Sequence, residues 1–502
     1  SRSVPVALAV GLLIGALVTA LLVGGTKAQL ATVSGDAADP GAAGASQTAA
    51  PGQGLAPTGP VGGASRPGSP GAGGLQSGAG GGGPAQGNGD QGRPQTNILG
   101  IDCAKLQTPG VRGITPTTIK IGVGLADLDA LKPLYGDAVT FGPQEQIFDA
   151  VFKGNLAQGA LPCGRHIVPV YQKYQVLTES QSRAVCQSFM NDEKVFAVIT
   201  TFSFRDPLCI TQENKSFLID EGYQIYQTQV AQSGGRLFSL HPPVDLWYRI
   251  WTNWVITRLA NQPGVKFGVY YNTTDPLRVA VVEKDILKVL KAHGITPVIA
   301  TSDASAAALI TGDPNDTSAV LKFKNEHVTH VMMSVENFMK EAQRQSYHPQ
   351  YFFAGTDAED ANAGRFDPDN GDGAQGLTWD RINDYHRGVK PSADQEQCVG
   401  YTTKAGIARP RQESGQWELT MIACDEVGIV VRAIRAAGAN LTTNRLALGA
   451  RTVTSWPGNF VGRGGYTDKK SYLVNENREA RYSKDCSCWK TTGDWKPLFL
   501  GR

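Results

Sequence analysis

The sequence predicts an α/β protein with two parallel-sheet lobes, preceded by an N-terminal apolar helix and a disordered linker. Three observations support this prediction. Short apolar runs alternate with helix-length segments from about residue 115 onward, this alternation occurs as two successive sets, and the first hundred residues contain little that can form a core. Strands that alternate with helices of 10–15 residues are typical of parallel sheets covered by helices.

The first set combines β-branched or apolar runs with amphipathic segments. Residues 195–199 are apolar throughout, as expected for a parallel strand that is buried on both faces. We expect strands at 119–123, 167–171, 195–199, a short one at Ile225 and one at 237–240, and helices at 141–152, 180–192 and 207–221.

The second set repeats the pattern and ends in long helical segments. The last helix of substantial length stops at an Ala-Gly-Ala sequence, which is a helix-termination signal. We expect strands at 265–270, 295–299, 328–333 and 351–353, and helices at 245–259, 279–292, 317–326, 336–346, 416–437 and 442–450.

The N-terminal part divides into an apolar segment and a linker. Residues 4–23 contain no charged side chain, and 20 such residues span a hydrocarbon core of about 30 Å. We therefore interpret residues 1–30 as a transmembrane anchor, with a cleaved signal segment as the alternative. Gly, Pro and Ala supply 41 of the 66 residues of segment 31–96, which has no aromatic residue, so we expect a disordered linker before a folded part at 97–502.

The cysteines indicate export from the cytoplasm. All eight follow the linker, and an even number confined to the folded part favours disulfides in an oxidising compartment. We predict Cys186–Cys209, between a helix and the residue just past the adjacent strand, and Cys398–Cys424, between the long helix and the loop before it. The pairing of the other four stays open; they are Cys103, Cys163, Cys486 and Cys488.

Composition and motifs exclude several function classes. The net charge of +2 lacks the basic excess of a nucleic-acid-binding protein. The only close cysteine pair, Cys486 and Cys488, is spaced too tightly for a usual zinc site. No serine-hydrolase, zinc-protease or phosphate-loop motif occurs. The sequence therefore predicts a protein that is not an enzyme and that carries neither metal nor cofactor.

Ligands of open α/β sheets bind beyond the carboxyl ends of the strands, and this rule selects candidate residues by position. The hydroxyl and backbone N–H groups after the third strand suit a carboxylate, although an ordinary helix-capping turn is the alternative. These first-lobe candidates are Thr200, Thr201, Phe202 and Ser203, then Thr228 and Gln229 after the next strand, and Tyr135 with Leu128 on the first loop.

Three acidic residues of the second set are further candidates. Asp245 begins a Trp-rich helix, Glu336 follows the strand at 328–333, and Asp357 follows the strand at 351–353. Asp245 has a structural alternative, because a carboxylate at a helix N-terminus interacts favourably with the helix dipole. We expect Trp247 to lie in the core or hinge rather than in a ligand wall.

Six short motifs occur in an order that resembles one family. They are IKIGV at 119–123, GALPCGRHIV at 159–168, DEKVFAVI at 192–199, VKFGVYY at 265–271, THVMM at 329–333, and CDEV at 424–427 with RAAGANLT at 435–442. In this order the chain resembles a type I periplasmic binding protein, similar to the branched-chain amino acid receptors of ABC transporters, over about residues 115–495.

The resemblance implies two Rossmann-like lobes joined by a three-segment hinge. It places the crossings near Pro242, Asp384 and Thr454. Lobe one would then comprise residues 115–242 and 385–453, and lobe two residues 243–384 and 454–502.

The resemblance also implies a function. An extracytoplasmic solute-binding protein would capture a small ligand, for example an amino acid or related polar molecule, by hinge closure and present it to an ABC permease. The ligand carboxylate would meet Thr200–Ser203, and its ammonium Asp245 or Asp357. We expect a monomer that is anchored in the bacterial cell envelope with its folded part outside the cytoplasm. A membrane-tethered sensor or cell-surface scaffold of the same fold is the alternative.

Overall fold

The computed structural model describes residues 110–129, 140–176, 179–202, 204–259, 262–304, 313–333, 337–354 and 367–499. The chain divides into two units, Ser1–Gly87 and Asn88–Arg502, and all the described residues belong to the second. The predicted anchor at 4–23 and the predicted linker lie outside the described residues. Among the helices that are described, none combines the length and the apolar composition that a membrane span requires.

The first sheet has five parallel strands in the order β2-β1-β3-β4-β5. All four residues of β3 and of β4 are buried, as expected for central strands covered on both faces. The strands are β1 (Thr118–Asp127), β2 (His166–Gln175), β3 (Ala197–Thr200), β4 (Phe217–Asp220) and β5 (Leu237–Ser239).

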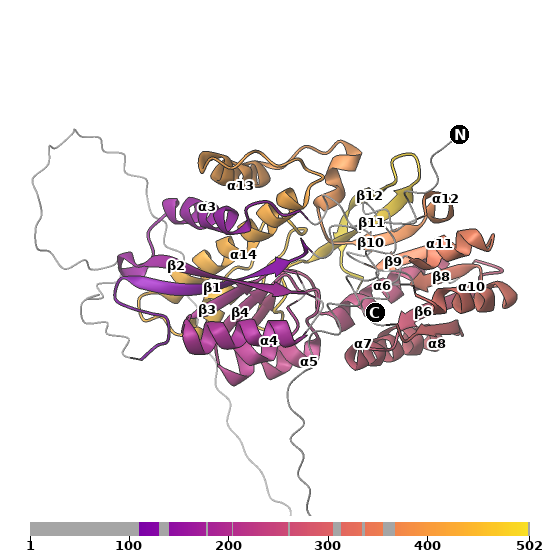
Figure 1. The fold of residues 1–502 in the computed structure, drawn as a ribbon, viewed down its shortest axis with the longest axis horizontal. Helices are drawn as coiled ribbons and strands as arrows, with labels where there is room; N and C mark the ends of the chain where they lie inside the picture. Colours follow the sequence, from indigo (N-terminus) through magenta and orange to yellow (C-terminus); the bar gives the residue numbers. More distant parts are fainter. Residues whose placement is uncertain are drawn as a thin grey trace, which may run out of the picture. The chain divides into compact units, whose positions relative to one another are not determined.

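Helices cover both faces of this sheet (Figure 1). One group contains α3 (Gln144–Ala157), α13 (Ala393–Lys404) and α14 (Gly415–Ala437), and the opposite group contains α4 (Glu179–Gln187) and α5 (Gln227–Gln232). The remaining elements are η3 (Pro162–Gly164), η4 (Ser188–Asp192), η5 (Cys209–Glu213) and α15 (Thr443–Arg451), which packs on α14 and β4. Elements from the late part of the sequence thus complete the first lobe.

The second sheet has seven strands in the order β12-β11-β10-β9-β8-β6-β7. Five are parallel: β6 (Phe267–Asn272), β7 (Val298–Ser302), β8 (His330–Met333), β9 (Gln350–Ala354) and β10 (Gln375–Thr378). The C-terminal hairpin of β11 (Glu476–Ser483) and β12 (Cys488–Pro497) adds antiparallel to β10. Because this hairpin is antiparallel, the second sheet is mixed and not wholly parallel as the sequence predicts. The sequence patterns did not predict the hairpin.

Alternate residues of β6 face two separate cores. Phe267, Val269 and Tyr271 pack into the large core that contains residues of α6 and α8, whereas Tyr270 packs with Phe323 and Phe338 of the opposite face. This alternation follows from the two-residue period of a strand. The helices of this lobe are α6 (Val244–Leu259), α7 (Pro276–Val281), η6 (Val282–Leu287), α8 (Lys288–Ala292), α10 (Asn315–Asn325), α11 (Asn337–Arg344), α12 (Pro368–Gly371) and η9 (Ile382–Arg387).

Two expected elements of the first lobe are wrong. The helix expected at 207–221 is the short helix η5 followed by strand β4, and the strand expected at Ile225 is a loop. Lys215 has a φ of 51° and turns the chain between η5 and β4. Hydrophobic periodicity cannot separate a four-residue buried strand from a buried helical segment, which explains the error. The correction places Asp220 and Glu221 at a strand end.

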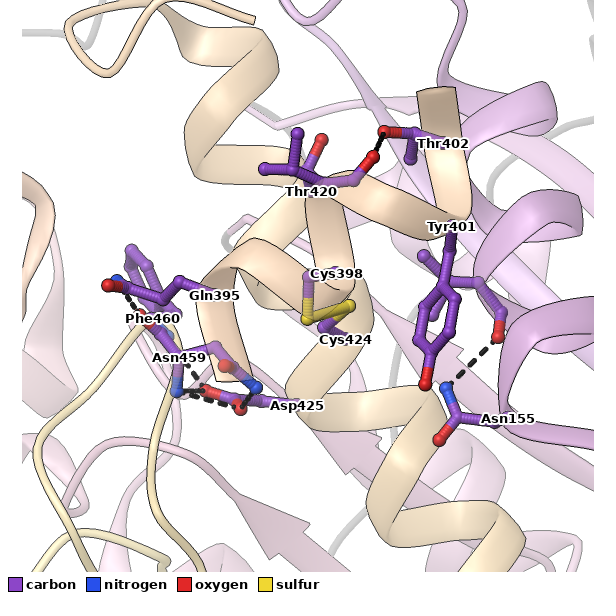
Figure 2. Close-up of a disulfide and its surroundings, with 12 residues drawn as sticks. Asn155, Gln395, Cys398, Tyr401, Thr402, Thr420, Cys424, Asp425, Asn459 and Phe460 are labelled. Atoms are coloured by element: carbon purple, nitrogen blue, oxygen red, sulfur yellow. Dashed lines mark hydrogen bonds between the residues drawn. A yellow bond between two sulfur atoms is a disulfide. The ribbon is translucent and has the colours of Figure 1, made fainter. Parts of the chain in front are cut away.

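Disulfides join helices in the first lobe. Cys186–Cys209 links α4 to η5 with a Cα–Cα distance of 6.3 Å, and Cys398–Cys424 links α13 to α14 with 6.1 Å (Figure 2). These are the two pairs that the sequence predicts, although Cys398 lies in helix α13 and not in the loop where the sequence places it. Cys486–Cys488, whose pairing was open, closes the turn of the C-terminal hairpin. Cys163 is disulfide-bonded as well, and Cys103 lies outside the described residues.

Candidate functional site

The carboxyl ends of three adjacent strands form one edge of the first sheet. Gly124 of β1 pairs with Thr200 of β3, which in turn pairs with Asp220 of β4. The residues that follow the last two strands, from Thr201 and from Glu221, therefore lie beside one another. Ligands of open α/β sheets bind at such an edge, so we treat it as the candidate site.

Polar groups at this edge already have partners within the protein. The Thr200 hydroxyl donates to Asp220 Oδ2 at 2.5 Å, and the Thr201 hydroxyl donates to the Gly124 carbonyl at 3.3 Å. The Phe202 backbone N–H donates to Glu221 Oε2 at 2.9 Å. The groups that the sequence assigns to a ligand carboxylate thus bond to oxygens of the chain itself. Ser203 lies outside the described residues.

Phe202 has a strained backbone at the same edge. Its φ of 47° falls in the left-handed region, which costs a non-glycine residue on the order of 1–2 kcal/mol. Its N–H bond to Glu221 holds it there. Its ring stacks on that of Phe141 with centroids 4.5 Å apart, and its carbonyl accepts the Tyr174 hydroxyl at 3.1 Å. Backbone strain that is held in place by neighbouring contacts is common at binding sites.

Three carboxyl groups lie buried behind the edge. Asp220, Glu221 and Glu426 of α14 are at most 1% exposed. Burial raises the pKa of Asp220 to about 7, and it raises the pKa of Glu221 and of Glu426 well above their usual values. Glu221 Oε1 and both oxygens of Glu426 have no hydrogen-bond partner. Burial therefore favours the uncharged form of both Glu221 and Glu426.

Sequence reasoning missed these acids for identifiable reasons. Glu221 was assigned to the end of a helix, where an acidic residue would be solvated. Glu426 stood in a helix whose other residues are mostly apolar, in the segment MIACDEVGIVV. An acidic pair inside such an apolar stretch is the signal that could have identified it, because buried charges need partners or become neutral.

A cavity of about 390 Å³ adjoins the edge, between the end of β1 and the start of α3. Its lining includes Asp127, Leu128, Phe141, Gln144 and Lys173. Gln144 Nε2 donates to the Ala126 carbonyl at 3.1 Å, while its Oε1 has no partner. The Phe141–Phe202 stack connects the cavity to the strand ends. Tyr135, the other predicted wall residue, lies outside the described residues.

Thr228 and Gln229 lie within the first turn of α5 rather than after a strand. The Thr228 side chain is exposed, and Gln229 Oε1 accepts the Tyr226 backbone N–H at 3.0 Å, which caps the helix. Gln229 thus has a local structural role.

Asp245 bridges the first crossing between the sheets. It is 6% exposed, and its Oδ1 accepts the backbone N–H of Gln227, the first residue of α5, at 2.9 Å. Burial raises the pKa of Asp245. Its carboxylate therefore caps a helix of the first lobe from the first turn of α6. The other two acidic candidates, Glu336 and Asp357, lie outside the described residues.

A second contact joins the strand-end loops of the two lobes. The Tyr226 hydroxyl donates to Asp275 Oδ2 at 3.3 Å. Asp275 follows β6 and caps α7, because its Oδ1 accepts the backbone N–H groups of Leu277 and Arg278 at 2.9 and 3.3 Å. This contact places the start of α7 against the loop that follows β4, where the lobes approach each other.

Three segments connect the sheets and bond to one another. The first is 239–243, from the end of β5 to α6, the second is 379–392, between β10 and α13, and the third is 452–475, between α15 and β11. Ser239 exchanges backbone bonds with Ser471 and Leu473 at 2.9 and 2.8 Å, which joins the first segment to the third. His241 Nε2 lies 2.6 Å from Asp380 Oδ1, and this fully buried pair joins the first to the second. Trp247 packs beside them on Trp379, with centroids 5.1 Å apart. Trp247 is buried, which agrees with the expectation of a core or hinge position.

The third segment is held by a carboxylate beside a disulfide (Figure 2). Asp425 follows Cys424 and accepts bonds from Trp456 Nε1 at 2.8 Å, from the Asn459 backbone and side-chain amides, and from the Phe460 N–H at 2.9 Å. Gln395 Nε2 donates to the Asn459 carbonyl at 2.8 Å. Helices α13 and α14 therefore anchor one end of the hinge.

The described residues contain no cluster of three or more His, Cys, Asp or Glu side chains arranged to hold a metal ion. The buried acids behind the strand edge accordingly do not form such a centre. The arrangement offers a cavity, a strained turn and three segments that connect the sheets.

No family model matches the chain, and no curated protein matches it in sequence. Solved structures match its fold. A branched-chain amino acid ABC transporter protein from Thermus thermophilus with bound valine is 15% identical, with a TM-score of 0.55, over 76% of this chain and 97% of that one. A fatty acid ABC transporter substrate-binding protein from Thermomonospora curvata is 14% identical, with a TM-score of 0.56, over 78% and 95%.

A third structure is the solute-binding protein of an ABC transporter from Rhodopseudomonas palustris in complex with 3,4-dihydroxybenzoic acid. It is 14% identical, with a TM-score of 0.53, over 76% of this chain and 98% of that one. The three bind or are named for chemically different solutes, so the fold does not specify a ligand. The chain has the fold of ABC-transporter substrate-binding proteins, the type I periplasmic binding fold that its sequence motifs resemble.

Proposed function

We propose that this chain is an extracytoplasmic solute-binding protein, and not an enzyme, that closes two lobes around a small molecule and presents it to an ABC importer. The observation that carries the proposal is the connection of two sheets by three mutually bonded segments, with a cavity at a strand edge of one of them. Rotation about such segments is a recognised mode of domain closure around ligands.

Closure requires a ligand that contacts both lobes, because only a preference for the closed state shifts the equilibrium. The Phe141–Phe202 wall and the cavity would supply the first-lobe contacts. The Tyr226–Asp275 contact would form one edge of the closed site. Tyr135, Ser203, Glu336 and Asp357 stay predicted contacts under this proposal.

The lobes under this proposal comprise residues 115–242 with 385–453, and residues 243–384 with 454–502. Packing of α13, α14 and α15 near α3 and β4 supports the first grouping, and pairing of β11 with β10 supports the second. Residues 1–30 would anchor the chain in the cell envelope. The 66-residue linker, treated as a Gly-rich coil, would let the binding domain reach roughly 45 Å from the membrane.

A membrane-tethered sensor or cell-surface scaffold is the second candidate. The apolar run at 4–23 and the long Gly-rich linker favour it, because they tie the domain to one place. Binding of a small molecule without any associated permease would distinguish a sensor from a transport receptor.

The proposed function can be tested without knowing the ligand. The full chain would be purified in detergent from an envelope preparation, denatured, and the released small molecules identified by mass spectrometry. We expect one compound class near stoichiometric amounts, and small-angle scattering should show compaction when it is added back. Absence of any bound compound, together with no compaction by a broad solute panel, would refute the proposal.

A further inference from the structure

We propose that the ligand is an organic cation, because Glu221 fills with its own carboxyl group the position where a ligand carboxylate would bind. This inference rests on the proposed function and specifies the ligand class of the same site. It differs from the zwitterionic ligand that the sequence motifs suggested.

Hydrogen-bond donors at the strand edge already have acceptors within the protein. An anion at such an edge binds to backbone N–H and hydroxyl groups that have no other partner. Here the Phe202 N–H donates to Glu221 Oε2 at 2.9 Å, and the Gly222 N–H and Thr200 hydroxyl donate to Asp220 at 2.7 and 2.5 Å. Two internal carboxyl groups therefore use three of the donors that a ligand carboxylate would need.

Among the described residues that line the neighbouring cavity, acidic side chains outnumber basic ones. Its described lining carries the carboxylates Asp127, Asp129 and Glu145 against the single cation Lys173. A ligand carboxylate would meet like charges there, whereas an ammonium or guanidinium group would meet opposite ones.

The acid that fills the position of the ligand carboxylate is fully buried. Glu221 is 0% exposed, and its Oε1 has no hydrogen-bond partner. A buried polar atom normally has a hydrogen-bond partner, so the presence of Glu221 Oε1 without one, beside the strained Phe202 turn, requires an explanation. The explanation is that Glu221 occupies the Phe202 N–H, which would otherwise be available to bind an anion.

The test uses the full chain, three probes of matched size and one larger amine, spermidine. Isoamylamine, isovalerate and leucine share one branched alkyl group and carry an amine, a carboxylate, or both. We expect isoamylamine, or a larger amine such as spermidine, to raise the melting temperature and to bind at least tenfold more tightly than isovalerate or leucine. Binding of isovalerate or leucine as tightly as the amines would overturn the inference but leave the solute-binding function intact. Failure of all amines would also count against it, and absence of any bound solute would refute both proposals.

Variants at Glu221 test the argument directly. Glu221→Ala should free the Phe202 N–H and raise the affinity for isovalerate at least tenfold over the unmodified chain. Glu221→Gln is the matched control, because its amide oxygen still accepts that N–H and no gain is expected. A folded Glu221→Ala protein with no gain for isovalerate would contradict the proposal. If this variant does not fold, the comparison of the three probes on the unmodified chain still decides.

A charge variant in the cavity gives an independent readout. Asp127→Asn keeps the size of the side chain and should weaken amine binding about tenfold. Asp468→Asn, an exposed change that does not line the cavity, should leave amine binding unchanged. Equal effects of the two substitutions would show that the cavity carboxylates do not recognise the ligand.

Discussion

Replacing Asp425 by Ala tests whether α14 anchors the hinge. The change removes the acceptor of the Trp456 Nε1–H, of both Asn459 amides and of the Phe460 N–H. A buried donor that loses its acceptor costs about 1–3 kcal/mol, and single substitutions rarely exceed about 4–5 kcal/mol in total. We therefore expect the free energy of unfolding to fall by about 3–5 kcal/mol.

Urea unfolding at pH 7, followed by tryptophan fluorescence, measures this loss. Asp425→Asn should cost less, because the amide oxygen still accepts from Trp456 while its NH₂ group faces a backbone donor. Asp468→Ala, in an exposed part of the third connecting segment, should change the free energy by no more than about 0.5 kcal/mol. A loss below about 1 kcal/mol for Asp425→Ala would refute the reasoning, since it would mean that solvent or rearrangement satisfies these donors.

Four further predictions follow from the sequence and the structure. A chain that begins at Asn97 should be soluble and monomeric in gel filtration. Its aggregation would contradict the prediction that the linker has no structural role. Replacing Cys398 and Cys424 by Ser should cost about 2–4 kcal/mol, since their disulfide closes a loop over a sequence separation of 26; non-reducing peptide mapping that finds Cys398 free would refute the pairing. Burial raises the pKa of Asp220 from 3.8 to about 7, so between these values the native state binds more protons than the unfolded state. The free energy of unfolding should therefore fall as the pH rises from 4 to 7, by up to about 1.4 kcal/mol per pH unit. Asp220→Asn should flatten this pH dependence in urea unfolding. Asp245→Ala should cost about 1 kcal/mol by uncapping α5, and an unchanged melting temperature would argue against the cap.

Local patterns were sufficient for much of the fold. Alternating strands and helices, the two disulfide pairs and the order of weak motifs all depend on residues near one another in sequence or on their spacing. The burial of a five- or six-residue apolar run can be predicted without knowing which segments pack against it, and strands such as β3 and β6 were predicted in this way. The same reasoning failed at β4, whose four residues are too short for any periodicity, and at the antiparallel hairpin, which has no continuous apolar run.

The chemistry of the site depended on contacts between distant residues. Thr200 is the last residue of β3 and Phe202 follows it, and from their sequence both offer donors to a ligand. Only the pairing of β3 with β4 brings Asp220 and Glu221 within hydrogen-bond distance, and only the packing of α14 buries Glu426 behind them. A side chain's donor capacity is thus a property of its residue type, but whether that capacity remains for a ligand is decided by which partners the tertiary structure places beside it.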